Sequence, residues 1–208
     1  MKGEKFFTEH DKERIRQAVV AAELKTSGEI VPMIVTSSAR YTEIELLGSI
    51  VGLLIGMIIE WIWSDPWGSP YVQLWPVIGA LIGFLLCRLS ALKRLLASSR
   101  RIGAAVHTLA LASFTDHGLH HTRDHTGILI LISLLEHRVE VLADRGINQK
   151  VSAGTWDEIV RIITNGIKSG NACDAFCRAI ERCGDILAEH FPRAADDRDE
   201  LPNQLVTK

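Results

Sequence analysis

The sequence predicts an α+β domain with a small mixed sheet, interrupted by a pair of helices long enough to cross a membrane. Two observations predict this class. Residues 46–63 and 74–92 are almost wholly apolar, whereas the sequence on both sides alternates between amphipathic helical patterns and short β-branched runs. With 208 residues, 23% charged and 47% hydrophobic, the chain is too polar to lie wholly in a membrane and too apolar in its middle to be wholly soluble.

The residues before the first apolar run predict one helix followed by one strand. Thr8 and Asp11 have the spacing of a capping box, in which each side chain bonds the backbone N–H of the other at the start of a helix. Apolar residues then recur at helical spacing from Ile15 onward. The β-branched run that follows predicts a strand at residues 30–36, although Pro32 favours an edge position or a bulge because proline has no N–H to donate.

The two apolar runs have the length of membrane-spanning helices. A helix needs roughly 17–25 apolar residues to cross a bilayer, and residues 46–63 and 74–92 each provide such a stretch. Tryptophan and tyrosine are enriched where a helix meets the membrane surface. The sequence therefore predicts a transmembrane hairpin in a lipid bilayer. The alternative is a hairpin buried in a soluble core, although such helices usually keep a polar stripe. The rings at the predicted interface are Trp61, Trp63, Trp67, Tyr71 and Trp75.

Positive charges predict the orientation of this hairpin. Lys and Arg side chains cluster around the end of the second run, and none lies in the turn at residues 64–74. Because cytoplasmic segments carry the excess of these residues, both termini are predicted to be cytoplasmic, in a multi-pass protein of the inner membrane. The first residues lack the apolar segment of a cleavable secretion signal, so the hairpin is expected to target the protein. The clustered cations are Arg88, Lys93, Arg94, Arg100 and Arg101.

Glycines form a stripe along each apolar run. They recur at every fourth position, a spacing that lets another helix backbone approach closely. Two interpretations follow. The stripes pack against each other within one chain, which we favour, or one of them binds a membrane-protein partner or a second copy in a homo-oligomer. The glycines are Gly48, Gly52 and Gly56 in the first run and Gly79 and Gly83 in the second.

After the apolar runs, the sequence predicts a helix and then a pair of strands. Ser98 or Ser99 is positioned to cap the helix. The runs at residues 127–134 and 137–144 predict two strands joined by a tight turn at residues 135–136.

Two amphipathic helices close the predicted domain. Thr155 and Asn171 each precede an acidic residue by three positions, which is the spacing of a capping box. From residue 192 onward the sequence is polar and interrupted by prolines, which predicts a flexible tail. The expected organisation is a domain in two parts, residues 1–45 and 97–191, with the hairpin at residues 46–96 between them and a tail at residues 192–208.

Three stretches of the sequence resemble the TPM domain family. They are FFTEHDKERIRQAVVAAELKTSGEIVPMIV before the hairpin, TGILILISLLEHRVEVLADRGI after it, and the helical pair that ends in GDILAEHFP. The resemblance implies an α/β/α-type domain with helices on a small sheet. It also implies the branch of bacterial membrane proteins that carry a two-helix insertion after the first strand. The family is often labelled a phosphatase domain, so phosphate chemistry is an expectation that comes with it.

The resemblance points to the loop after the third predicted strand as a candidate site. Members thought to bind metal or cleave phosphate esters carry a glycine, a hydrophobic residue and a glutamate there. In this sequence Asp144, Gly146 and Ile147 match, but Asn148 stands at the glutamate position. Hard cations such as Ca²⁺ and Mg²⁺ bind through several oxygen ligands, often carboxylates. A divalent-metal site in this loop is therefore expected to lack charge.

A histidine-rich stretch provides a second set of metal candidates. On a continuous helix, His117, His121 and His125 would share one face and could ligate a transition metal. The chain is expected to leave the helix near residue 122, which would scatter these side chains and leave them solvated. The metal candidates are therefore His117 and His121, together with Asp144 from the loop.

Two functional classes follow from these observations. The first is a membrane-anchored cytoplasmic module that binds or assembles membrane complexes without catalysis. The alternative is a membrane-tethered, metal-dependent hydrolase of phosphate esters, with Asp144, Asp124 and Arg123 as its catalytic candidates. The missing acids favour the module. No nucleic-acid partner is expected, because the net charge is −2 and the pI is about 6.4, whereas a nucleic-acid-binding domain is usually basic.

Overall fold

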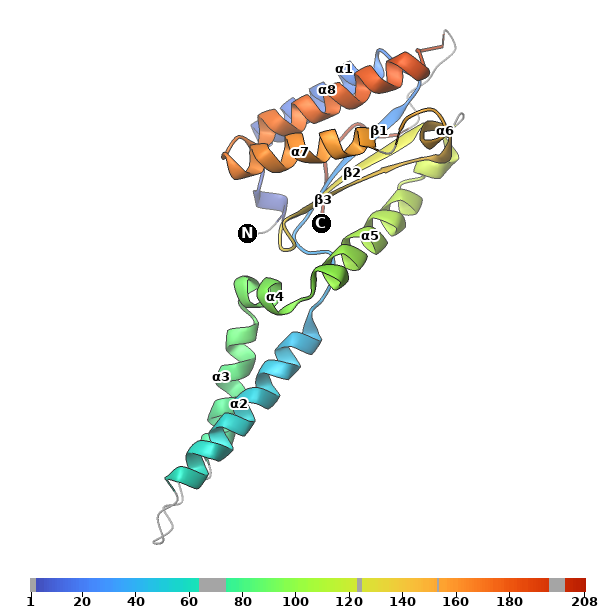
Figure 1. Ribbon diagram of the computed structural model, residues 1–208. Helices are drawn as coiled ribbons and strands as arrows, with labels where there is room; N and C mark the ends of the chain where they lie inside the picture. Colours follow the sequence, from blue (N-terminus) through green and yellow to red (C-terminus); the bar gives the residue numbers. More distant parts are fainter. Residues whose placement is uncertain (1–2, 64–73, 123–124, 153, 195–200) are drawn as a thin grey trace. The chain divides into compact units, whose positions relative to one another are not determined.

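The computed structural model describes residues 3–63, 74–122, 125–152, 154–194 and 201–208 (Figure 1). The chain divides into two compact units. The sheet unit comprises Met1–Ser38 and Gly103–Lys208, and the hairpin unit comprises Ala39–Ile102. The sheet unit is therefore built from segments on both sides of the apolar runs.

A four-stranded mixed sheet forms the centre of the sheet unit. Its strands are β1 (Glu29–Val35), β2 (Gly127–Ser133), β3 (Arg138–Ala143) and β4 (Val206–Thr207), in the order β3-β2-β1-β4. β1 and β2 run parallel over seven residues each, and β2 and β3 are antiparallel. The predicted mixed sheet of an α+β domain is confirmed. The strand before the hairpin finds its partner in the strand after it.

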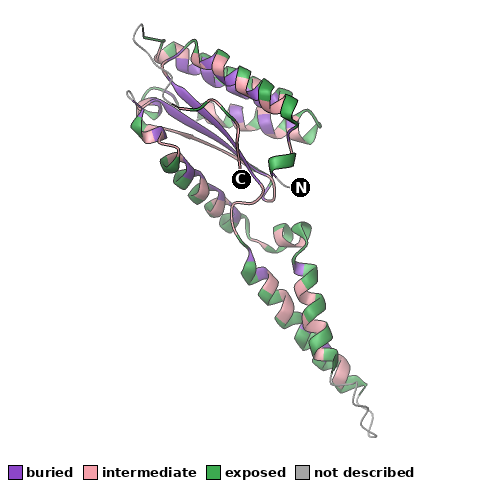
Figure 2. Cartoon of the chain, turned by 180° about the vertical axis from the view of Figure 1, so that it is seen from behind, coloured by how far each residue is buried: buried purple, intermediate pink, exposed green. Residues whose placement is uncertain are grey.

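Helices cover both faces of this sheet (Figure 1). α1 (Glu9–Glu23), α7 (Gly154–Lys168) and α8 (Ala172–His190) pack on one face, and α5 (Ser99–Asp116) packs on the other. Each face has its own apolar cluster, and the two clusters alternate along the strands as the pleat requires. Figure 2 shows the strands buried between these layers. Short helices complete the unit: η1 (Gly3–Lys5), η3 (Leu119–His121) and α6 (Arg145–Asn148).

Local capping signals predict some helix ends better than others. The capping box of α1 is present: the Asp11 N–H donates to Thr8 Oγ1 at 3.2 Å, and the Thr8 N–H donates to Asp11 Oδ2 at 3.0 Å. The prediction that Thr155 caps α7 is wrong, because that helix already begins at Gly154. Thr155 instead places its hydroxyl 3.0 Å from the Ser152 hydroxyl. Asn171 precedes α8 as predicted, but its side chain makes no capping bond.

Pro32 lies in an inner strand, between β2 and β4, and not in an edge strand or at a bulge as predicted. The side of β1 that faces β4 is nevertheless almost as open as an edge strand, because β4 pairs only with Met33 and Ile34. Two residues before Pro32, the Ile30 N–H donates to a side chain and not to a strand: it bonds Glu23 Oε1 at 3.0 Å. Proline is therefore tolerated where no neighbouring strand needs its N–H.

The end of the chain belongs to the sheet. Residues 192–208 were expected to form a flexible tail, but Val206–Thr207 forms β4. Lys208 extends this pairing: its N–H donates to the Ile34 carbonyl at 3.0 Å, and its carbonyl accepts from the Thr36 N–H at 2.9 Å. The polar composition of this segment concealed a short parallel strand whose partner lies far away in sequence.

The hairpin unit contains two packed apolar helices of unequal length. α2 (Thr42–Ile62) has 21 residues and is about 31 Å long at about 1.5 Å per residue, enough to cross a bilayer core. The second run was expected to form one spanning helix, but it divides into α3 (Trp75–Cys87) and α4 (Ser90–Leu96), which meet at 88°. By length and composition, α2 alone qualifies among the described helices unless the bent pair crosses as one unit.

Candidate functional site

The candidate site lies where β1 and β2 begin and β3 ends. Glu29 pairs with Gly127 in the parallel ladder, and the Asp144 N–H donates to the Gly127 carbonyl at 2.9 Å. Residues from three strands therefore meet at one end of the sheet. These residues lie at the ends of the strands. We call this end of the sheet the polar end and define it by Glu29, His125 and Asp144.

Asp144 is largely committed to local structure. Its Oδ1 accepts a hydrogen bond from the Arg145 N–H at 2.6 Å and so caps the first turn of α6. Its Oδ2 lies 3.1 Å from Nδ1 of His125, and the side chain is 12% exposed. Both oxygens of this predicted catalytic carboxylate are thus already engaged, one by a backbone donor and one by an imidazole.

His125 lies at this end of the sheet, and the sequence did not identify it as a partner of Asp144. Its Nε2 lies 2.7 Å from Nη2 of Arg145, which can only donate, so Nε2 accepts and the proton is assigned to Nδ1. The ring then donates to Asp144 and bridges the carboxylate and the guanidinium. His125 has φ 54°, a left-handed conformation that is uncommon outside glycine, and pattern rules do not anticipate it. To act as a base, His125 would have to lose Arg145.

Asn148 has a structural task that a glutamate could not perform. Its side-chain Nδ2 donates to the Ala143 carbonyl at 2.6 Å, at the end of β3. A glutamate carboxylate is an acceptor and would face this carbonyl without a proton to share. The residue that departs from the family pattern therefore stabilises the strand end.

The histidine stretch does not form the helical face that a continuous helix would give. α5 ends at Asp116, Gly118 adopts a positive φ of 72°, and η3 follows. His117 is half-buried, and this burial lowers the pKa of its imidazole. The described residues contain no group of three or more His, Cys, Asp or Glu side chains that could hold a metal ion. The catalytic candidates Arg123 and Asp124 lie outside the described residues.

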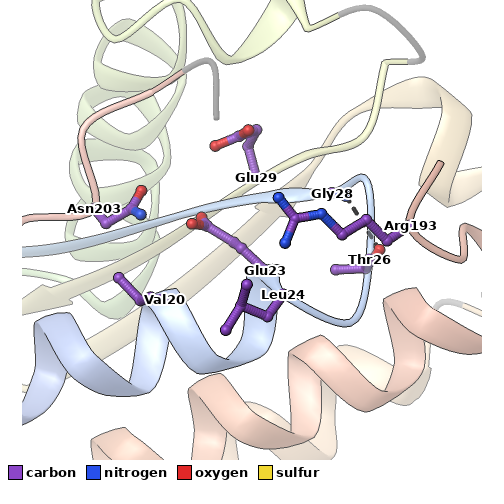
Figure 3. A pocket seen from close by; sticks show the side chains of 8 residues that line it. All are labelled: Val20, Glu23, Leu24, Thr26, Gly28, Glu29, Arg193 and Asn203. Atoms are coloured by element: carbon purple, nitrogen blue, oxygen red, sulfur yellow. Dashed lines mark hydrogen bonds between the residues drawn. The ribbon is translucent and has the colours of Figure 1, made fainter. Parts of the chain in front are cut away.

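A small pocket beside Glu29 was not predicted from the sequence. The pocket has a volume of about 60 Å³. Figure 3 shows the side chains of Glu23, Glu29 and Arg193 among those that line this pocket. Arg193 and Asn203 come from the segment expected to be a tail, so composition alone hid their role. The lining residues are Val20, Glu23, Leu24, Thr26, Gly28, Glu29, Arg193 and Asn203.

Burial favours the protonated thiol at Cys173 and Cys177. All four cysteines are free thiols. Burial raises the pKa of the Cys173 thiol to about 12 and also raises the pKa of Cys177. Cys173 Sγ donates to the Asp11 carbonyl at 3.8 Å. Because metals bind the thiolate, protonated thiols in this setting are weak ligands.

The glycine stripes of the hairpin unit face each other. A Cβ on Gly52 would collide with the Gly79 carbonyl, and a Cβ on Gly83 would collide with the Gly48 carbonyl. Gly56 approaches the backbone of Trp75 and Pro76 equally closely. The five stripe glycines therefore let the facing backbones approach closely within the hairpin, and an apolar pocket of about 450 Å³ lies along them.

The predicted interface aromatics that the structure describes lie at one end of the hairpin unit. Trp61 is 79% exposed and Trp63 is 69% exposed. Trp63 and Trp75 contact each other edge to face, with ring centroids 6.5 Å apart. Trp67 and Tyr71 lie outside the described residues.

Comparisons with known proteins support the family resemblance. Residues 95–186 match the sequence model of the TPM domain, which confirms the resemblance for the part of the chain after the hairpin. No curated protein matches the sequence. The fold is similar to the NMR structure of the BA42 protein from the psychrophilic bacterium Bizionia argentinensis, with a TM-score of 0.63 and 22% identity over 99% of this chain and 97% of that one. At this identity the likeness shows the fold alone.

Proposed function

Because residues 95–186 match the TPM domain, we propose that the protein is a membrane-anchored TPM module. In this proposal the sheet unit and both termini are in the cytoplasm, and the module binds or assembles membrane complexes at the inner membrane without catalysis. The observation that carries the proposal is the state of the loop after β3. Its carboxylate caps a helix and bonds His125, and Asn148 closes a strand end.

The surface of the hairpin unit supports membrane anchoring. The closest faces of α2 and α3 are glycine, so the bulky apolar side chains point outward and remain exposed. Exposed apolar patches of this extent are rare on soluble monomers, whereas acyl chains solvate them without cost. The outward side chains include Leu46, Leu47, Ile50, Leu54, Ile58, Val77, Leu81 and Leu85.

Ion pairs within the hairpin unit fit the proposed orientation. Lys93 pairs with Glu45, and Arg101 pairs with Glu43. These charges lie at the start of α2 and after α3, away from the tryptophan-flanked turn. In the proposed topology the charged end meets the cytoplasmic surface and the turn lies outside.

Cysteine labelling in intact cells tests this topology. The four native cysteines are replaced by alanine, and a single cysteine is introduced as Ser69→Cys in the turn or as Lys168→Cys in the sheet unit. We expect an impermeant maleimide to label Ser69→Cys in intact cells and Lys168→Cys only after permeabilisation, because the two positions lie on opposite sides of the membrane. Labelling of Lys168→Cys in intact cells, with Ser69→Cys protected, would reverse the proposed orientation. Recovery of the chain in the soluble fraction would exclude anchoring.

A membrane-tethered hydrolase is the second candidate, and the pair formed by His125 and Asp144 is the observation in its favour. A histidine oriented by a carboxylate is a common general base. Here its second nitrogen is held by Arg145, and neither the loop nor the described residues assemble a cluster of acids for Ca²⁺ or Mg²⁺. The pair is therefore better explained as a support for the turn into α6.

A phosphatase assay separates the two candidates. We expect purified protein to hydrolyse an aryl phosphate no faster than a vector control, with Mg²⁺, Mn²⁺ or Ca²⁺ present. Asn is also a good helix cap, so Asp144→Asn removes the charge while keeping the start of α6. Turnover well above the control that is lost in Asp144→Asn and kept in Trp156→Phe would replace the module with the hydrolase.

A further inference from the structure

The outer edge of β3 is open. Among the described residues, β3 is the last strand of the sheet and pairs only with β2. The Asp144 N–H donates to β2, so in the alternating antiparallel pattern Arg138, Glu140 and Leu142 also direct their backbone groups to β2. Val139 and Val141 direct theirs away from the sheet. Within the described chain, the backbone groups of these two valines have no hydrogen-bond partner.

Asn148 marks the end of this open edge. The Ala143 carbonyl faces the same way as those of Val139 and Val141, but it accepts the Asn148 side chain. The open backbone groups are therefore confined to the first part of β3. Such a row of free donors and acceptors is a ready template for another strand.

The side chains along this edge carry alternating charge on one face. Arg138 is exposed, and its guanidinium lies beside Gly103 of α5. A Cβ added to Gly103 would lie 3.3 Å from Arg138 Nη1. Glu140 is partly exposed, and its Oε1 lies 3.0 Å from His107 Nδ1. A strand with a cation and an anion two residues apart can complement itself when paired antiparallel.

We infer that β3 pairs with β3 of a second copy of this chain, antiparallel about a two-fold axis at Val139. This register places Arg138 of each copy opposite Glu140 of the other. An axis at Glu140 would oppose two glutamates, which is destabilising. An axis at Val141 would require the Ala143 carbonyl, which Asn148 already occupies. Charge and capping therefore select the register in which the Val139 N–H and carbonyl of each copy bond those of the other copy, and this pair joins the two sheets.

Disulfide trapping tests the register directly. In this pairing Arg138 of one copy and Glu140 of the other form a non-hydrogen-bonded pair. Their Cα atoms are roughly 4.5 Å apart, a distance that suits a disulfide. Full-length Arg138→Cys and Glu140→Cys chains, with native cysteines replaced by alanine, are mixed in detergent micelles and oxidised gently. We expect a disulfide-linked heterodimer from the mixture and little from either variant alone. Efficient linking of Glu140→Cys to itself would overturn the register, and no linking in any mixture would overturn the pairing.

Sedimentation of the full chain with its native cysteines provides an independent test. Val139→Pro removes an outward N–H without touching a bond to β2, and we expect it to abolish the dimer. Val139→Thr keeps both the N–H and the shape and should leave the dimer intact. Arg138→Glu and Glu140→Arg should each weaken association by roughly tenfold, and the double exchange should restore it. A dimer that survives Val139→Pro, or single reversals that the double exchange does not rescue, would contradict the inference. Thermal unfolding of each variant confirms that the sheet unit is folded.

Discussion

Phe176→Ala is expected to lower the free energy of unfolding of the sheet unit by about 3–5 kcal/mol. Phe176 is fully buried in α8, and its ring stacks on Phe7 with centroids 6.0 Å apart and planes inclined by 16°. The change removes a large buried side chain and leaves a cavity between α8, the N-terminal segment and the sheet. Chemical denaturation followed by circular dichroism, on full-length protein in detergent, measures the loss.

Leu24→Ala is the matched control for this prediction. Leu24 also loses a large apolar side chain, but it is 61% exposed, so the expected loss is below about 0.5 kcal/mol. If the two variants lost equal stability, the packing of α8 against the N-terminal segment described here would be wrong.

The second prediction concerns Gly52 in the hairpin unit. A Cβ at this position would collide with the Gly79 carbonyl oxygen and lie 2.8 Å from its carbonyl carbon, a contact that real Cβ atoms do not make. Gly52→Ala should therefore force α2 and α3 apart at a cost of about 1–3 kcal/mol. Hydrogen exchange of the amides in α2 and α3 should accelerate by a factor of about 5–150.

Gly154→Ala serves as the control for the glycine substitution. Gly154 begins α7, and no atom lies within 4 Å of a Cβ placed there. We expect exchange throughout the hairpin unit to be unchanged in this variant. Unchanged exchange in Gly52→Ala as well would mean that the two stripes do not face each other.

The local elements could be predicted because their signals are local. A capping box, a helical period or a β-branched run lies within a few residues, and the energies that select it act at that range. The capping box at Thr8 and the two strands after the hairpin therefore appeared where expected. The glycine spacing likewise indicated close helix packing, because a stripe without side chains has one common use in an apolar helix.

Several features of the fold depend on partners distant in sequence. β4 is two residues long and has no pattern of its own, so its pairing with β1 could not be predicted from a polar segment. The chain breaks between α3 and α4 because Leu89 adopts an extended conformation. This break lies inside the second apolar run, so hydropathy did not indicate it. Composition measures the length of an apolar run but not the direction of the backbone within it.

The sequence by itself determined the α+β class, the apolar hairpin, the TPM resemblance and the shortage of acids after β3. Only the tertiary structure decided what the remaining polar residues do. It brought His125, from before β2, to Asp144, from after β3, and it turned Asn148 toward a strand carbonyl. It also left the outer edge of β3 open. The physical reason is that hydrogen bonds join groups by distance in space, and the sheet register that sets this distance is a property of the whole packed domain.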